Sequence, residues 1–223
     1  MTAKFHFINH ACLCWKKTIP LSSSTRIWTI IRKDSPPKTL RLIIFSSATV
    51  TSTIWAVPLK SPKNCDATII STAEICGLAQ DAGCKAHAMH LGGTFKFPFG
   101  KVRLTLAFHG SGVPGGHACG IVIDFYGTKL YFAGDTALFS DMQLLPKLDA
   151  FEYAVLPIGG NFTMDPNDAL IACKLLQAKY VIPVHYNTWP PIAQDVEAFK
   201  AAVEDETDSK VLIVKPGNTI DID

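Results

Sequence analysis

The chain has 223 residues, 48% of them hydrophobic and 18% charged, so it can form one domain with a sizeable core or at most two small ones. Its net charge of +2 argues against a polyanionic partner such as nucleic acid. The seven cysteines have neither the spacing of a disulfide framework nor that of a zinc finger, so we expect a reducing, cytoplasmic setting.

The first third of the chain differs in composition from the rest. Residues 1–65 hold ten Lys or Arg and one acid, Asp34, whereas the other 158 residues hold eleven bases and eighteen acids. One folded domain seldom divides so sharply. The basic, Ser-rich start is typical of a transit peptide, and the uncharged stretch 42–59 has the length of a membrane span. The Ser, Thr and Pro content of 42–59 argues against a membrane span, so we expect no membrane association. The lack of an Arg-bearing amphipathic helix argues against a transit peptide.

From residue 65 onward the pattern is regular and predicts an α/β fold. It begins with a buried strand at 67–70, a helix from Ser71 to Gly83, and two hairpins that pair 95–97 with 102–108 and 120–125 with 129–133. Asp165 as N-cap and Pro166 at the first helical position then start a helix to about Ala178. A strand at 180–183, a helix at 195–204 and a final strand at 211–214 complete the prediction.

Three polar residues stand at the ends of these apolar strands: His109, Asp135 and His185. A lone His after a strand is more often structural, and Gly-Asp-Thr alone is usually a turn with an Asx hydrogen bond. Three such strand ends in one chain, however, favour a shared site, because α/β folds place ligands there. Two imidazoles and a carboxylate suit zinc or another borderline divalent ion.

Four longer strings carry a resemblance to a known family. They are Met-His-Leu-Gly-Gly at 89–93, Gly-Asp-Thr-Ala-Leu-Phe-Ser-Asp-Met at 134–142, Leu-Pro-Ile-Gly-Gly-Asn-Phe-Thr-Met at 156–164 and Pro-Val-His-Tyr-Asn-Thr at 183–188. Residues 65–223 resemble the metallo-β-lactamase superfamily, in its bacterial metal-dependent hydrolase branch near the lactonase-like members. The resemblance implies a single domain over 1–223, an αββα sandwich whose N-terminal part is incomplete or disordered.

The resemblance also implies roles for the strand-end residues. His109 would bind the first metal, Asp135 would bridge both metals as the catalytic carboxylate, and His185 would bind the second. The metals would be two zinc ions, with manganese or iron as alternatives. A metal-bound hydroxide would attack a small ester, lactone, amide or phosphoester, whose oxygen the metals polarise.

Further residues lie in or near the family strings. By resemblance, Asn161, Thr163 and Asn187 would orient the substrate or the metal ligands, although loop capping explains each of them too. His90 would line the pocket, whereas His117 and His87 read as surface residues. Gly160 departs from the branch, which usually has an acid there. Three aromatic residues fit either a pocket lining or core packing: Phe139, Phe162 and Trp189.

The family's H-x-H-x-D-H motif is missing, because no His falls between His10 and His87. We shifted the reading frame between Ala48 and Ala56, so that each new codon combines the third base of one residue with the first two bases of the next. The shifted codons can encode H-G-H-[FLIV]-D-H-L-G. We therefore interpret residues 14–64 as an out-of-frame, non-native segment and 65–223 as the intact body. The rival interpretation is a divergent N-terminal segment.

Together these observations predict a cytoplasmic metal-dependent hydrolase that acts on a small molecule, with self-association left open. Without the motif, we expect the chain as written to bind metals weakly, because metal affinity depends on ligand count. The alternative is a non-catalytic remnant or binding protein that has lost half of its metal site. A nuclease is not supported, since the body from Asp66 onward is net acidic.

Overall fold

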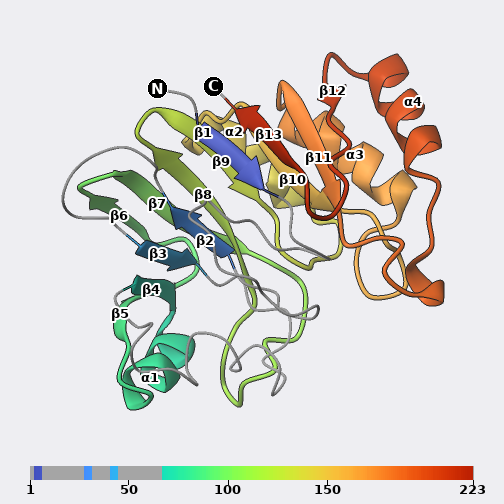
Figure 1. The fold of residues 1–223 in the computed structure, drawn as a ribbon. Helices are drawn as coiled ribbons and strands as arrows, with labels where there is room; N and C mark the ends of the chain where they lie inside the picture. Colours follow the sequence, from blue (N-terminus) through green and yellow to red (C-terminus); the bar gives the residue numbers. More distant parts are fainter. Residues whose placement is uncertain (1–2, 7–27, 32–40, 45–66, 223) are drawn as a thin grey trace.

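The computed structural model of the chain describes residues 3–6, 28–31, 41–44 and 67–222 (Figure 1). The strands are β1 (Ala3–His6), β2 (Trp28–Ile31), β3 (Arg41–Ile44), β4 (Ala67–Thr72), β5 (Lys85–Met89), β6 (Thr94–Phe97), β7 (Gly100–Leu106), β8 (Cys119–Phe125), β9 (Thr128–Phe132), β10 (Tyr153–Pro157), β11 (Tyr180–Val184), β12 (Lys210–Val211) and β13 (Thr219–Ile222). The helices are α1 (Ala73–Asp81), η3 (Ser140–Leu144), α2 (Leu145–Leu148), α3 (Pro166–Leu176), η4 (Pro190–Ile192) and α4 (Val196–Glu206).

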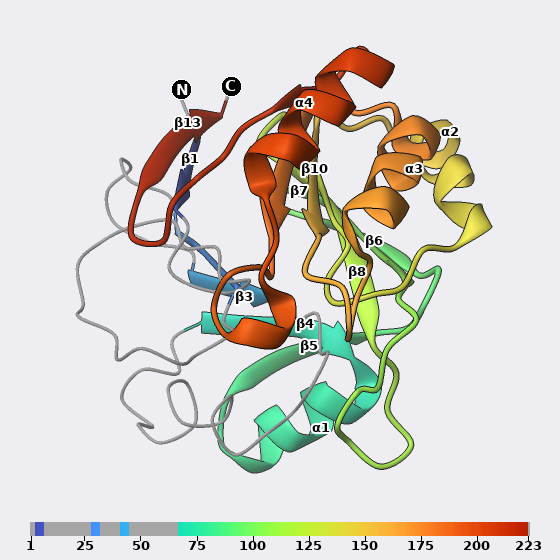
Figure 2. The same ribbon diagram turned by 90° about the vertical axis from the view of Figure 1, so that its right-hand side faces the viewer.

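The described strands form a layered arrangement. A seven-stranded sheet has the order β12-β11-β10-β9-β8-β7-β6, and a four-stranded sheet has the order β2-β3-β4-β5. Helix α1 packs on β4 and β5 at the outside of the smaller sheet, while α3 and α4 cover the far face of the larger one (Figures 1 and 2). Strand β1 pairs antiparallel with β13, which joins the two ends of the described chain. This is the αββα sandwich that the sequence predicts.

The central strands of the larger sheet are buried on both faces, and the directions of their side chains explain why. On β9 and β10, Leu130, Phe132 and Tyr153 point into the core between the two sheets. Their neighbours Tyr131 and Ala154 point to the opposite face and pack under the helices. Because successive residues of a strand face opposite sides, a strand buried on both faces needs a nearly continuous apolar run.

Most predicted elements from residue 65 onward are confirmed within one or two residues, including both hairpins and the Asp165 cap of α3. The prediction of a final strand at 211–214 is wrong. Strand β12 ends at Val211, and the last strand is β13, which lies beyond the Pro-Gly-Asn turn and pairs with β1. An apolar run of four residues does not show how many of those residues pair with a neighbouring strand.

The segment 14–64, which we interpreted as out of frame, lies largely outside the described residues. Within it the structure describes only the backbone of β2 and β3, where β3 pairs antiparallel with β2 and parallel with β4. Among the described residues, no helix combines the length and the apolar character needed to cross a membrane.

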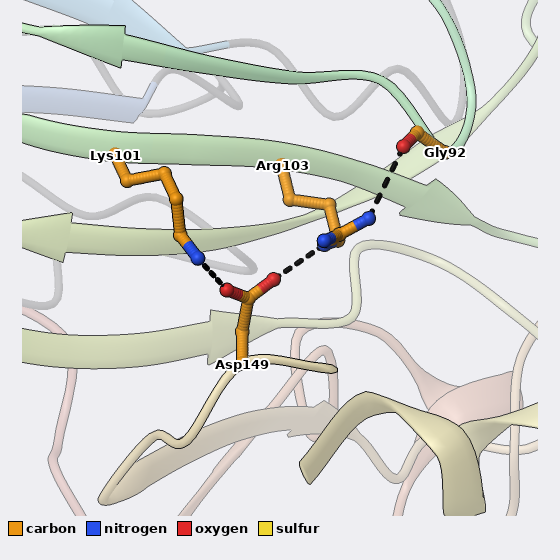
Figure 3. A network of polar contacts seen from close by, with 4 residues as sticks. All are labelled: Gly92, Lys101, Arg103 and Asp149. Carbon is orange, nitrogen blue, oxygen red and sulfur yellow. Dashed lines mark hydrogen bonds and ion pairs between the residues drawn. The ribbon is translucent and has the colours of Figure 1, made fainter. Parts of the chain in front are cut away.

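A buried carboxylate ties the end of α2 to the larger sheet (Figure 3). Asp149 forms ion pairs with Lys101 and Arg103, which project from the same face of β7. Arg103 also donates a 3.2 Å hydrogen bond to the carbonyl of Gly92. Burial raises the pKa of the Asp149 carboxyl, but the hydrogen bonds and charges of Lys101 and Arg103 outweigh it and hold that pKa below its usual range.

Candidate metal centre

The directions of the strands bring four loops to one edge of the larger sheet. Strands β9, β10 and β11 are parallel, and β7 runs with them because both β7 and β9 are antiparallel to β8. The loops that follow these four strands therefore emerge at the same edge, which we call the carboxyl edge. His109 lies in the loop after β7, Asp135 in the loop after β9 and His185 directly after β11.

Asp135 and His185 meet at the carboxyl edge. Their side chains are 4% and 3% exposed, and Nε2 of His185 lies 3.7 Å from Oδ2 of Asp135. That separation is too long for a hydrogen bond. It is close to the roughly 3.4 Å expected between two ligands about 2.1 Å from a shared tetrahedral ion. The geometry of this pair therefore suits a divalent ion between the two side chains.

His185 has a left-handed backbone, with φ of 60°, which is uncommon for a residue other than glycine. The chain turns sharply there, at the end of a buried strand, and the ring stays in the interior. Gly159 makes this possible, since a Cβ at its position would lie 2.2 Å from the carbonyl oxygen of His185 and 3.2 Å from its Nδ1. The strain at His185 is maintained by close packing, as is common at functional sites.

His109 is half-buried, and its Nδ1 lies 3.0 Å from the carbonyl oxygen of Gly110. Because a carbonyl only accepts, this contact suits the tautomer with its proton on Nδ1, in which Nε2 has the lone pair that a metal needs. The backbone ties this loop to that of Asp135. The N–H of Phe108 donates to Oγ1 of Thr136 at 2.9 Å, and the N–H of Ala137 donates to the carbonyl of Phe108 at 3.2 Å.

The loop after β10 contains Asn161 and Thr163. It is joined to the Asp135 loop by a 3.0 Å hydrogen bond from the N–H of Met164 to the carbonyl of Thr136. Asn161 is exposed, with φ of 54°. Thr163 is half-buried, and its hydroxyl donates to the carbonyl of Met164 at 3.4 Å. The loop that carries both residues is thus joined to the Asp135 loop, and Asn161 is exposed to solvent.

Asn187 organises the loop after β11. Its side-chain amide donates to the carbonyl of Gln194 at 3.0 Å and accepts from the N–H of Gln194 at 2.7 Å. Gln194 in turn donates through Nε2 to the carbonyl of Gly159 at 2.9 Å, which joins this loop to the one after β10. Both ends of the Asn187 amide are therefore engaged in holding the loop.

His90 follows β5 and so comes from the smaller sheet. It is exposed, and its Nδ1 accepts a 2.9 Å hydrogen bond from the N–H of Leu91. Its ring centroid lies 5.3 Å from that of His117, which precedes β8. The sequence did not indicate this contact, nor did it indicate the positioning roles of Gly159, Thr136 and Gln194. The only signal for Gly159 and Thr136 was their place inside the family strings.

The donors fit a metal in kind but form an incomplete set. Among the described residues, no three His, Cys, Asp or Glu side chains gather closely enough to hold an ion. A catalytic zinc usually has three protein ligands. Asp135 and His185 therefore supply a pair, with His109 in a neighbouring loop, and a complete centre needs donors beyond these.

Comparison with known proteins agrees with this fold. Residues 49–186 match the family described as the beta-lactamase superfamily domain. A UPF0173 metal-dependent hydrolase of Natranaerobius thermophilus is 52% identical over 164 residues, 74% of each chain. The solved structure of Igni18, a metallo hydrolase of Ignicoccus hospitalis, is 26% identical with a TM-score of 0.80, covering 100% of this chain and 99% of that one. The metallo-beta-lactamase fold protein YhfI of Bacillus subtilis shares the fold, at 10% identity and a TM-score of 0.64, with 99% and 100% of the two chains covered.

Proposed function

We propose that this chain, a metal-dependent hydrolase that belongs to the beta-lactamase superfamily, cleaves a small ester, lactone, amide or phosphoester at the carboxyl edge. The observation that carries the proposal is the buried pair of Asp135 and His185, 3.7 Å apart at the ends of two parallel strands. A small molecule is the substrate that suits a site formed by loops at the carboxyl ends of parallel strands.

His109, Asp135 and His185 would hold the metal, which we propose to be two zinc ions, with manganese or iron as alternatives. Asp135 would be the carboxylate shared by the two ions, and His185 the imidazole beside it. When bound, a divalent ion supplies an acidified water and polarises the scissile carbonyl or phosphoryl oxygen.

The remaining contributions come from the chain's own side chains. The Nδ1–H of His109, fixed on the carbonyl of Gly110, aims Nε2 away from the backbone. We assign Asn187 to holding its loop, and Asn161, whose amide is exposed, to hydrogen bonding with the substrate. Thr163 would position the loop of Asn161. His90 would contact the substrate from the side of the smaller sheet.

The incomplete donor set favours a second candidate, a non-catalytic remnant or binding protein. The H-x-H-x-D-H motif is missing from the sequence, and the described residues hold no cluster of three donors. In a chain that retains only part of its site, His109, Asp135 and His185 would hold at most one loosely bound ion.

Metal content measured together with hydrolysis separates the two candidates. The purified full chain would be loaded with zinc, manganese or iron, and its bound metal counted by mass spectrometry. It would then be assayed on an ester, a lactone, an amide and a phosphodiester. Hydrolysis that is abolished by a chelator and by Asp135→Asn supports the hydrolase. A chain with one equivalent or less and no hydrolysis of any substrate is the remnant.

A further inference from the structure

Three large aromatic side chains are exposed at the carboxyl edge. Phe108, Phe162 and Trp189 are 59%, 50% and 46% exposed, and they belong to the loops after β7, β10 and β11. Phe139 is instead 9% exposed and belongs to the core under the helices. The structure thus decides between the two readings that the sequence left open. Phe139 is a core residue, and Phe162 and Trp189 are surface residues.

Phe162 and Trp189 form a stacked pair, although they come from different loops. Their ring centroids are 5.6 Å apart, and their planes are inclined by only 18°. The rings therefore present a continuous apolar surface while each remains about half exposed. Exposed aromatic surface of this kind is unfavourable in water, so a grouped and ordered example indicates a binding role.

The backbone holds both rings in place. On one side, the N–H of Ile192 donates to the carbonyl of Trp189 at 3.2 Å, and the Asn187–Gln194 hydrogen bonds close the same loop. On the other, the N–H of Gly160 donates to the carbonyl of Met164 at 2.9 Å, which closes the turn that carries Phe162. A surface that is ordered before binding loses little conformational entropy when a ligand arrives.

This aromatic surface is close to the metal centre. Trp189 follows His185 by four residues, so their Cα atoms are at most about 14 Å apart. The loop of Phe162 begins at Gly159, which packs directly against His185. It ends at Met164, which is hydrogen bonded to the residue after Asp135. The two rings and the Asp135–His185 pair are therefore carried by directly connected loops at the carboxyl edge.

We infer that the Phe162–Trp189 pair is a specificity surface that binds an aryl or other planar apolar group of the substrate. The inference rests on the proposed function for one point only, namely that the reacting bond sits at Asp135 and His185. A flat ring is the group that stacks best on a half-exposed aromatic face, because stacking adds to the free energy of apolar burial. The hydrolysed substrate would thus be an aryl-substituted ester, lactone, amide or phosphoester rather than a short aliphatic one.

Binding can be tested without hydrolysis, using a ketone in place of the scissile carbonyl. The probe is 4-(4-fluorophenyl)butan-2-one, titrated with the full chain and followed by fluorine NMR, with and without zinc. The compared chains are the unchanged protein, Phe162→Ala, Trp189→Ala and Tyr126→Ala. Tyr126 is a matched control, since it is 52% exposed and lies in the β8–β9 turn at the opposite edge of the sheet. Thermal unfolding checks that each variant is folded.

We expect the unchanged protein and Tyr126→Ala to bind the probe equally. Phe162→Ala and Trp189→Ala should each weaken binding about 3- to 10-fold. Butan-2-one, which lacks the ring, should compete poorly with the probe in all four chains. Equal binding by all four chains, or no binding by any, overturns the inference.

The two proposals can fail separately. Ring-dependent binding without hydrolysis of any substrate would support the aromatic specificity surface and contradict the proposed activity. Hydrolysis with equal kcat/KM for phenylbutanoyl and acetyl esters retains the activity and removes the aromatic surface. In the first case Phe162→Ala still weakens binding, and in the second it changes neither binding nor kcat/KM.

Discussion

The two edges of the seven-stranded sheet each hold a buried carboxylate, and the two carboxylates have different surroundings. At the carboxyl edge, Asp135 faces the imidazole of His185 at 3.7 Å, beyond hydrogen-bond range. Toward the opposite edge, Asp149 is engaged by Lys101 and Arg103 (Figure 3). The edges also differ in their connections, because β7 and β8 are joined by a long loop at the carboxyl edge, whereas tight hairpin turns join β6 to β7 and β8 to β9 at the opposite edge.

The two carboxylates differ in the group that compensates their charge. A buried carboxylate costs free energy unless a cation compensates it. At Asp149 the chain supplies that cation from its own side chains, so the carboxylate stabilises the fold. At Asp135 the neighbouring group is an imidazole, and we propose that a divalent ion supplies the positive charge. Substitutions at the two sites should therefore change different measured quantities.

The largest effect is expected for Asp135→Asn, which removes the charge and keeps the shape. Hydrolysis should fall by about a thousandfold or more, or about 4 kcal/mol of transition-state stabilisation, because the amide is a poor metal ligand. Steady-state kcat/KM and metal content by mass spectrometry measure the loss. Asp149→Asn is the control and should leave kcat/KM per folded molecule unchanged. Equal losses in the two variants would remove the distinction between the edges.

Gly159→Ala comes next, because it displaces His185 without changing a ligand. A Cβ there would lie 2.2 Å from the carbonyl oxygen of His185 and 3.0 Å from Cβ of Ile192. The backbone must shift, which should lower kcat/KM about 100-fold and the free energy of unfolding by about 2 kcal/mol. Urea unfolding and kinetics measure both quantities. Gly77→Ala, at a helical position with open space, should change neither by a comparable amount.

At the opposite edge, Asp149→Ala should destabilise the fold and leave chemistry intact. The side chain of Asp149 is 4% exposed, but that of Lys101 is 43% exposed and can regain water. The expected loss is therefore about 2 kcal/mol of unfolding free energy, below the value for a fully buried pair. Lys174→Ala provides the contrast, since its ion pair with Glu206 is exposed on both sides and should contribute about 0.5 kcal/mol or less. Urea unfolding that ranks these two variants in the reverse order would contradict this assignment.

The smallest effect concerns pH and again involves Asp149. Its pKa is lowered in the folded protein, so its contribution to stability is fully present above the unfolded value of about 4. That contribution is lost as the pH falls through the folded pKa. The difference in unfolding free energy between the unchanged protein and Asp149→Asn should be constant near neutral pH and shrink below about pH 4. A difference that grows on acidification would show that the folded pKa is not lowered.

Much of the fold from residue 65 onward could be predicted from local patterns. The alternation in β7, the hairpin turn at Tyr126 and the Asp165 cap of α3 are all encoded within a few residues. The position of the last strand could not be predicted, because β13 is a strand only through its pairing with β1, some two hundred residues earlier in the chain. The fate of residues 14–64 stays a prediction, and nucleotide sequence across codons 10 to 70 is its test.

The sequence alone places three candidate metal-binding residues at the ends of strands: His109, Asp135 and His185. Only the tertiary structure decided that Asp135 and His185, fifty positions apart, lie 3.7 Å from each other. It also decided that Phe162 and Trp189 stack in solvent while Phe139 is buried. The physical reason is the distance along the chain over which each effect acts. Periodicity and turn chemistry act over a few residues, whereas the parallel crossovers that bring strand ends together depend on the packing of both faces of the sheet.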